Sequence, residues 1–245
     1  MSSRAAILAV ARPVARSISL AVDIVPLTTR EHSLAVLLLR NPDARSRDRW
    51  VLPWDGLLGG ESPDDAAHRV ARAAAGVPPA MVEQVGAFAD GRRHPGDAEM
   101  SIGFVALVPT SDVVASVGTH PTNGRASTAP QWFALSELPP LSPRQRAIVD
   151  VVARAVRART DQSPLAFRLL PATFTLSDLQ GVYELLLGRR LHKASFRRAL
   201  QAAFLVEPTD EWRSEGRGRP AQLFRYAPRR RRAARRGLRF DLFDE

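Results

Sequence analysis

The stretch from residue 174 to residue 226 constrains the fold most strongly, because two helix patterns in it are followed by a basic hairpin pattern. Thr175 can cap the first helix, with Asp178 three residues later in a weak capping-box arrangement. Gly188 can end that helix without steric cost. Apolar residues recur between them at helical spacing, at Leu176, Leu179, Val182, Tyr183 and Leu186. This spacing predicts a helix that buries one face.

A second helix is predicted after the short basic turn Arg189-Arg190. Phe196, Leu200 and Ala203 share one face of this helix and are expected to point inward. The outward positions are then Ser195, Arg197, Arg198 and Gln201. Two helices joined by a short turn are typical of a helix-turn-helix unit.

A strand signal follows at residues 204–206, then a span rich in Gly and Arg at residues 213–220. Residues 221–226 alternate like a returning strand. The sequence therefore predicts a winged helix over residues 164–228. Its second helix suits the major groove of DNA, and its wing suits the backbone or the minor groove.

The charge distribution supports a polyanion partner for this part of the chain. Residues 1–150 hold 15 basic and 15 acidic residues, so the whole net charge of +10 lies in residues 151–245. A neutral half joined to a strongly basic half indicates a sensing or assembly domain attached to a domain that binds nucleic acid. A small module that binds another protein, with solvated arginines, is the alternative.

The composition sets further limits. A chain of 245 residues with 45% hydrophobic content suits two modest domains with real cores. The absence of cysteine excludes disulfides and thiolate metal sites, and it fits a reducing cytoplasm. No apolar run reaches membrane-spanning length. Residues 1–17 are interpreted as a flexible extension rather than a signal peptide.

The first part of the chain mixes strands and helices irregularly. Strands are predicted at residues 18–25, 34–39, 85–89, 100–108 and 131–135, and a loop at 109–130. A helix is predicted to begin after Ser62, with Pro63 in its first turn, and to end at Gly76. These elements favour a mixed α/β sandwich.

Residues 18–139 resemble a Nudix domain. The signature G-x5-E-x7-R-E-U-x-E-E-x-G-U lines up through Gly60-Glu61, Arg69 and Gly76-Val77. In Nudix hydrolases its carboxylates bind Mg²⁺, which activates water against a pyrophosphate. Here the first glycine of the signature falls on Asp55, and the later glutamates fall on Val70, Ala73 and Ala74. A hard cation needs several oxygen ligands, so we expect no catalytic residues, no metal site and no hydrolysis.

A Nudix fold without its metal cluster can still hold a nucleotide. The Gly-rich turn at residues 56–60 can present backbone amides, and nearby arginines can offer positive charge. The candidate ligand-binding residues are Gly59, Gly60, Glu61, Arg69, Arg92 and Arg93. His94 stands where ADP-ribose-type Nudix proteins have the aspartate of an Arg-Asp-Pro motif, and we interpret it as a loop residue. Ordinary turn residues are the alternative for all of these positions.

A linker helix is predicted within residues 141–163, capped by Ser142 with Pro143 at its first position. Its apolar face comprises Ile148, Val149, Val152 and Val156. Much of the remainder is occupied by Arg144, Arg146, Arg154, Arg157 and Arg159. The helix can pack on its own domain or on a second subunit.

The order of Nudix-like domain (residues 18–140), linker helix and winged helix resembles the Nudix-related transcriptional regulators of bacteria, the NrtR family. Specific similarity lies in the Phe-Thr-Leu…Leu-Gln…Tyr-Glu run from Phe174 and in the Gly-Arg-Pro-Ala ending at Ala221. The resemblance implies a homodimeric repressor of NAD biosynthesis and salvage genes that senses ADP-ribose or a related nucleotide and needs no cofactor. The family often has Leu-Ala-Phe-Asp-His where this chain has residues 141–145, so the relay of ligand binding can differ here.

For such a repressor we expect a palindromic operator in double-stranded DNA, a cytoplasmic, nucleoid-associated location and no membrane contact. Base contacts are assigned to Ser195, Arg198 and Gln201, with Arg197 nearby. Phosphate contacts are assigned to Thr175, Lys193, Arg217, Arg219 and Arg225. Two alternatives are a Nudix-type nucleoside-diphosphate hydrolase tethered to nucleic acid, and non-specific binding driven by the Arg-rich tail, residues 229–245.

Overall fold

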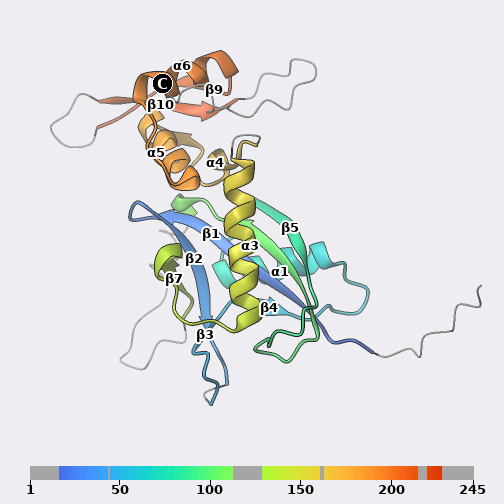
Figure 1. Ribbon diagram of the computed structural model, residues 1–245. Helices are drawn as coiled ribbons and strands as arrows, with labels where there is room; N and C mark the ends of the chain where they lie inside the picture. The colour runs from blue at the N-terminus through green and yellow to red at the C-terminus, as the bar shows by residue number, and fades with distance from the viewer. Residues whose placement is uncertain (1–16, 44, 113–128, 161–162, 215–219, 228–245) are drawn as a thin grey trace, which may run out of the picture.

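The computed structural model describes residues 17–43, 45–112, 129–160, 163–214 and 220–227 (Figure 1). The expected N-terminal extension up to residue 16, residues 113–128 of the expected loop and the Arg-rich tail lie outside the described residues. The first domain contains β1 (Leu20–Arg30), β2 (Ser33–Arg40), β3 (Trp50–Val51), β4 (Trp54–Asp55), α1 (Pro63–Ala75), β5 (Met81–Phe88), β6 (Met100–Leu107), β7 (Gln131–Ala134) and the short 3-10 helix η1 (Leu135–Glu137).

These strands form a mixed sheet whose main path runs β3-β2-β1-β6-β5. β4 also pairs with β1, and β7 pairs with β2. The pairing of β1 with β6 is parallel, from Leu20 opposite Met100 to Leu27 opposite Leu107. The other pairings are antiparallel. Eleven residues of β1 lie at the centre of this sheet, and nearly all of them are buried.

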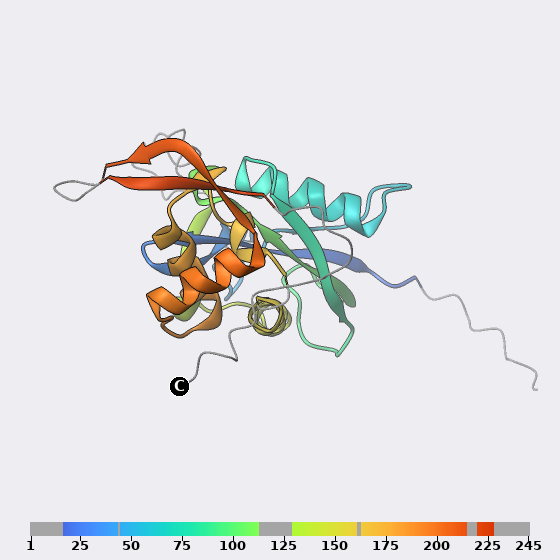
Figure 2. The same ribbon diagram turned by 90° about the horizontal axis from the view of Figure 1, so that it is seen from above.

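Helices cover both faces of the sheet, as the view from above shows (Figure 2). Val22 and Ile24 of β1 pack with Ala67 and Val70 of α1 on one face. Val25 lies on the opposite face, in the cluster that holds the apolar side of the long helix α3. Alternate residues of a strand point to opposite faces, so β1 serves both layers. The predicted mixed α/β sandwich is confirmed, and its layers are α/β/α.

The long helix α3 (Pro143–Arg159) begins as predicted, because the hydroxyl of Ser142 accepts a hydrogen bond from the Gln145 backbone N–H. Its predicted apolar face, Ile148, Val149, Val152 and Val156, is buried. Seventeen residues at 1.5 Å each give a helix about 25 Å long. It runs from the β3–β4 end of the sheet to the second domain (Figure 1). Within the part of the chain that the structure describes, no helical segment combines the length and the hydrophobicity that a bilayer span requires.

The second domain contains α4 (Leu165–Arg168), β8 (Thr173–Phe174), α5 (Leu176–Leu187), α6 (Lys193–Ala203), β9 (Val206–Arg213) and β10 (Ala221–Tyr226). Its three strands pair in the order β8-β10-β9, all antiparallel. Two helices followed by this hairpin form a winged helix, as predicted. Val152 and Val156 of α3 share one buried cluster with Leu165, Phe174 and Leu179. The two domains therefore have a continuous core.

Local caps position α5 as the sequence predicts. The Thr175 hydroxyl accepts from the Asp178 N–H at 3.1 Å, and the Asp178 carboxylate accepts from the Thr175 N–H at 2.8 Å, which completes a capping box. Gly188 ends the helix at φ 70°, in the left-handed region that glycine tolerates. Arg213 at the end of β9 donates twice to the same carboxylate, at 2.8 and 2.9 Å. Asp178 thus joins the start of α5 to the wing.

Some expectations were wrong. Residues 204–206 do not start a strand at Phe204, because that residue ends α6 in the left-handed region at φ 51°. β9 instead runs from Val206 to Arg213, through polar residues that alternate on a half-exposed hairpin. The short β3, β4, β8 and α4 were not predicted, since two to four residues carry no periodic signal. β5 begins at Met81, four residues before the expected start.

Replacement of Asp178 by alanine is expected to destabilise the protein by about 1–2 kcal/mol, because the cap acceptor and the Arg213 partner are lost together. Burial acts to raise the pKa of Asp178, but hydrogen bonds from Arg213 and Thr175 outweigh it and lower the pKa below 3.8. A carboxyl with a lowered pKa contributes its stability above its ordinary pKa and loses it as the pH falls through the folded value.

The free energies of unfolding of wild type and Asp178→Ala should therefore differ most at pH 7 and should begin to converge as the pH falls below about 3.8, the ordinary pKa of this carboxyl. Urea titrations at several pH values measure this difference. Asp150→Asn, at an exposed ion pair on α3, serves as the control and should change little. A difference that stays constant down to pH 2 would contradict the role given to the Asp178 charge.

Candidate nucleic-acid interface and nucleotide site

The outer face of α6 is basic and accessible. Phe196 and Leu200 are buried beneath the helix, whereas Arg197, Arg198 and Gln201 are exposed. This confirms the predicted inward positions Phe196 and Leu200 and the predicted outward positions Arg197, Arg198 and Gln201. Ser195 is half-buried, and its hydroxyl lies 3.3 Å from Nδ1 of His192. Lys193, the first residue of the helix, is exposed. The exposed side chains can reach base edges if the helix enters a major groove.

Contacts from α5 fix the turn before α6. The Glu184 carboxylate accepts from the Leu191 backbone N–H at 2.9 Å and from the side chains of Gln180 and Arg190 at 3.0 and 3.3 Å. Burial acts to raise the pKa of Glu184, but these hydrogen bonds and the Arg190 charge outweigh it and lower the pKa. Edge contact between the rings of Tyr183 and Phe196, 5.6 Å apart, joins the two helices. The orientation of α6 therefore depends on α5.

The remaining candidate DNA contacts differ in how they are placed. The Arg225 side chain on β10 is 63% exposed and pairs with Glu207 at 3.2 Å. Thr175 is only 4% exposed and caps α5. Arg217 and Arg219 lie outside the described residues. The phosphate-contact role of these residues stays a prediction.

The retained part of the Nudix signature forms an ion-pair cluster. Arg69 on α1 donates to both Glu61 oxygens at 2.8 Å, to Asp55 at 2.6 Å and to the Gly56 carbonyl at 3.1 Å. The hydrogen bond from Arg69, a backbone hydrogen bond from Leu58 and the Arg69 charge lower the pKa of Glu61 to about 2, although desolvation opposes them. The same carboxylates raise the pKa of Arg69. Glu61 and Arg69 are thus held by each other.

The three positions where the Nudix signature has further glutamates hold apolar residues, and none of them faces the Glu61–Arg69 cluster as an oxygen ligand. Val70 is buried against the sheet, Ala73 is exposed and Ala74 packs beside Leu37. Within the described ranges, no group of three His, Cys, Asp or Glu side chains is placed to hold a metal ion. Gly59 and Gly60 lie in the exposed turn before α1, where Gly60 has φ 78°. They are next to Glu61, but the structure does not gather Arg92 and Arg93 into the same cluster.

Arg92 and Arg93 instead line a separate open cavity of about 380 Å³ between the β5–β6 loop and the start of α3. Arg92 pairs with Asp90 at 3.4 Å, and Arg93 pairs with Asp48 at 2.5 Å. The full lining comprises Ala89, Gly91, Arg92, Arg93, His94, Asp97, Ala98, Glu99 and Arg144. The predicted ligand residues therefore fall into two groups, one at the Nudix turn and one at this cavity.

A buried polar cluster, missed by sequence reasoning, lies beneath this cavity. Asp23 Oδ1 accepts from Nε2 of His94 at 3.1 Å and from the Gln145 amide at 2.8 Å, and Asp23, His94 and Gln145 are at most 1% exposed. His94 Nδ1 accepts from the Gly96 N–H at 3.1 Å, so its proton is on Nε2. Gln145 Oε1 also accepts from the Leu52 N–H at 3.0 Å. The sequence did carry one sign of this cluster, because Asp23 is an acidic residue within an otherwise mainly apolar strand, β1.

The structure adds burial to the interpretation of His94 and corrects the interpretation of Arg144. His94 does lie in a loop, but it is buried against the edge of the Trp54 ring, 4.8 Å between centroids. A Cβ on Gly96 would come within 2.1 Å of that ring, so glycine permits this close approach. Arg144 was assigned to the polar side of the linker helix, yet it is only 1% exposed and donates to the Ala98 carbonyl at 2.8 Å. It turns inward because the β5–β6 loop covers the start of α3.

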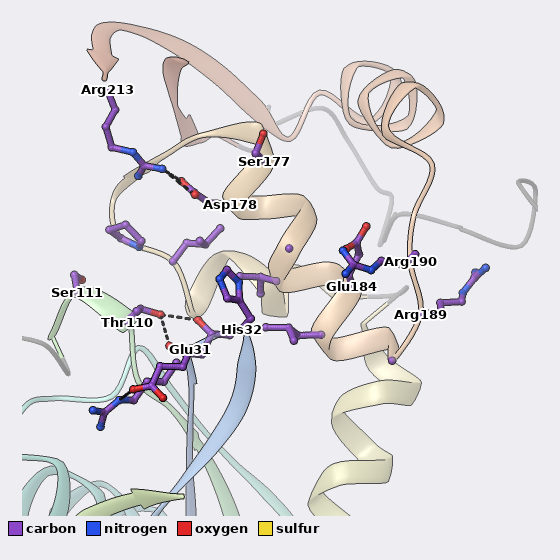
Figure 3. Close-up of a pocket in the computed structure, with 18 residues that line it drawn as sticks. Glu31, His32, Thr110, Ser111, Ser177, Asp178, Glu184, Arg189, Arg190 and Arg213 are labelled. Carbon is purple, nitrogen blue, oxygen red and sulfur yellow. Dashed lines mark hydrogen bonds and ion pairs between the residues drawn. The ribbon is translucent and has the colours of Figure 1, made fainter. Parts of the chain in front are cut away.

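A larger groove of about 1060 Å³ separates the two domains (Figure 3). Glu31 and His32, at the β1–β2 turn, lie on one side, and Asp178 and Glu184 of α5 lie on the other. Thr110 also lines the groove and joins the two domains, because its backbone N–H and its hydroxyl donate to the Leu169 carbonyl at 3.1 and 3.0 Å. The hydroxyl also lies 2.6 Å from that of Thr29. This junction places the winged helix against the end of β1.

Fold and site together define a two-domain protein, a Nudix domain followed by a DNA-binding winged helix. Family models agree with this division: the NUDIX domain matches residues 18–152, and the NrtR DNA-binding winged helix domain matches residues 166–226. The first match includes the N-terminal part of α3. The chain belongs to the NrtR family of Nudix-related transcriptional regulators.

Individual relatives agree with this family. The ADPR responsive transcriptional repressor NtrR of Acinetobacter baylyi is 27% identical over 209 residues, which is 84% of this chain and 81% of the relative. The crystal structure of Shewanella oneidensis NrtR complexed with a 27mer DNA has a TM-score of 0.73 at 26% identity, over 85% of this chain and 94% of that one. A MutT/nudix family protein from Enterococcus faecalis shares the fold, with a TM-score of 0.66 at 19% identity over 86% and 89% of the two chains.

Replacement of Gln145 by leucine should lower the free energy of unfolding by about 2–3 kcal/mol, because the buried Asp23 charge and the Leu52 N–H each lose a partner. Urea denaturation measures the change. Gln84→Leu, on an exposed position of β5, is the matched control and should stay within about 0.5 kcal/mol of wild type. Equal stability of Gln145→Leu and wild type would show that the buried cluster does not hold α3.

Proposed function

We propose that this chain is a sequence-specific DNA-binding transcriptional repressor whose Nudix domain senses a nucleotide. The observation that carries the proposal is the exposed face of α6, Arg197, Arg198 and Gln201, presented by a winged helix that shares a core with a Nudix domain. Base edges are assigned to Ser195, Arg198 and Gln201. The Shewanella relative, crystallised with DNA, supports this role for the domain.

ADP-ribose or a related nucleotide is the proposed effector, and the genes of NAD biosynthesis and salvage are the proposed targets. The ADPR responsive repressor of Acinetobacter supports the effector. Arginines beside the 380 Å³ cavity and backbone amides at the Gly59-Gly60 turn are of the type that binds phosphates. No further cofactor enters the proposal.

The Nudix domain is proposed to bind its nucleotide without hydrolysing it. Glu61 is the only signature glutamate retained, and Arg69 already holds both of its oxygens. Val70, Ala73 and Ala74 offer no oxygen ligands for Mg²⁺. The arrangement therefore favours a binding domain over an enzyme.

The proposed repressor acts as a homodimer on a palindromic operator in the bacterial cytoplasm, on the nucleoid. Two winged helices related by a twofold axis would place their α6 helices in successive major grooves. The net charge of +10, concentrated after residue 150, favours association with DNA. The phosphate contacts in this arrangement are Thr175, Lys193, Arg217, Arg219 and Arg225.

Replacement of Arg198 by alanine is expected to weaken operator binding by about 10-fold or more while unrelated DNA loses little, because a base contact carries about 1–3 kcal/mol of discrimination. A gel shift on a promoter fragment from a NAD-salvage gene, with a scrambled fragment as competitor, measures both. Arg72→Ala removes an equal charge from an exposed position of α1 and should bind like wild type. Equal losses on both fragments would remove Arg198 from base recognition.

With Mg²⁺ and ADP-ribose, the purified protein is expected to release no nucleotide monophosphate above a blank without protein, because three metal-binding glutamates are missing. Chromatography of the nucleotides over several hours is the measurement. Release that needs Mg²⁺ and disappears in Glu61→Gln would establish the hydrolase alternative instead.

A further inference from the structure

We propose that the cavity lined by Arg92, Arg93 and Arg144 binds the diphosphate of the nucleotide effector, and that Arg144 is a residue that contacts it. This inference rests on the proposed function and deepens it, because it names the phosphate subsite within the Nudix domain. The cavity volume of about 380 Å³ lies in the range of small-molecule sites.

Arg144 is a buried cation with too few partners. Its side chain is 1% exposed and makes one hydrogen bond within the described residues, from Nη1 to the Ala98 carbonyl. Its Nε is buried without a hydrogen-bond partner there, and the nearest carboxylate, Asp90, lies 3.9 Å away. A guanidinium stays charged and has five donors. An anionic group that binds at the cavity would complete this set.

The loop around the cavity can supply such a group with further donors. Asp90 lies between Arg92 and Arg144 and pairs loosely with both, at 3.4 and 3.9 Å. A diphosphate has more acceptor oxygens than one carboxylate and can replace Asp90 as the partner of both arginines. The exposed carboxylate of Asp97, on the same lining, is an acceptor suited to a ribose hydroxyl. This combination of donors and acceptors suits a nucleoside diphosphate sugar.

The Nudix turn is less suited to the diphosphate. Arg69 is already bound by Asp55 and Glu61 in short ion pairs of 2.6 and 2.8 Å. Nε, Nη1 and Nη2 of Arg69 all donate to protein oxygens, so a phosphate there would have to displace existing hydrogen bonds. Nε of Arg144, by contrast, has no hydrogen-bond partner among the described residues. Phosphates are therefore assigned to the cavity, and the turn is left for other parts of the ligand.

The location of Arg144 connects the cavity to the DNA-binding domain. It belongs to the first turn of α3, and its backbone N–H donates to the Arg93 carbonyl at 3.3 Å. The neighbouring Gln145 bonds to the buried Asp23. Val156, near the other end of the same helix, packs in the cluster that includes Leu165 and Leu179 of the winged helix. A ligand on Arg144 thus acts on a helix that both domains share.

Isothermal titration calorimetry with ADP-ribose tests this assignment on full-length wild type, Arg144→Gln, Arg144→Lys and Arg146→Gln. Arg146 lies on the same helix with a 53% exposed side chain, so its variant is the matched control. We expect at least a 10-fold weaker affinity for Arg144→Gln and wild-type affinity for Arg146→Gln. Arg144→Lys keeps the charge but loses Nε, and an intermediate affinity is expected. If Arg144→Gln does not fold, the lysine variant carries the test.

Adenosine, which has no phosphate, separates a phosphate contact from a general loss of structure. Its affinity, measured by competition with ADP-ribose, should be the same in wild type and Arg144→Gln. Wild-type ADP-ribose affinity in both Arg144 variants would overturn the subsite and leave the proposed effector intact. An equal loss of adenosine and ADP-ribose affinity would overturn the phosphate contact. If wild type does not bind ADP-ribose, the proposed effector and this subsite both fail.

Discussion

The packing of α3 on the sheet is the contact on which the rest of the structure depends. Its apolar face, Ile148, Val149, Val152 and Val156, is at most 4% exposed, and full burial of each such side chain contributes about 1.5–3 kcal/mol. The same cluster contains Val25 and Val105 of the sheet and the buried residues of α4, α5 and α6. Neither domain can lose this helix without exposing apolar surface. A shift of α3 at either end therefore changes the packing of both domains.

Polar contacts give this packing a defined register. An apolar face alone would allow α3 to slide or rotate, but Gln145 reaches a single buried carboxylate, Asp23, and the single backbone N–H of Leu52. Asp23 lies on the side of β1 that faces α3, two residues from Val25. At the winged-helix end, Asp178 and Glu184 hold the wing and the turn before α6 in the same way. The basic face of α6 is thus presented by elements that are fixed relative to the Nudix fold.

The sequence predicted the elements with strong periodicity or caps and missed those formed by distant contacts. The capping box at Thr175 and Asp178, the end of α5 at Gly188 and the buried face of α3 depend on neighbours in sequence, and all are confirmed. The buried cluster joins Asp23 to residues 71 and 122 positions away, which no local pattern reveals. Arg144 shows the same limit, because its burial is imposed by the loop that follows β5. The α6 face was predicted, and the predicted ligand residues Arg92 and Arg93 line the cavity, but Arg144 on the same lining was not predicted as a ligand residue.

We propose that a nucleotide in the Nudix domain and DNA on the winged helix influence each other through the shared core. The most direct test is the affinity of ADP-ribose for the free protein and for the protein saturated with its operator, together with the operator affinity at zero and saturating ADP-ribose. Linkage requires the same coupling factor in both directions, typically about 5- to 150-fold. We expect equal coupling factors that differ clearly from one. If both ligands bind tightly and the coupling factor is one, the proposed coupling between the two domains is contradicted.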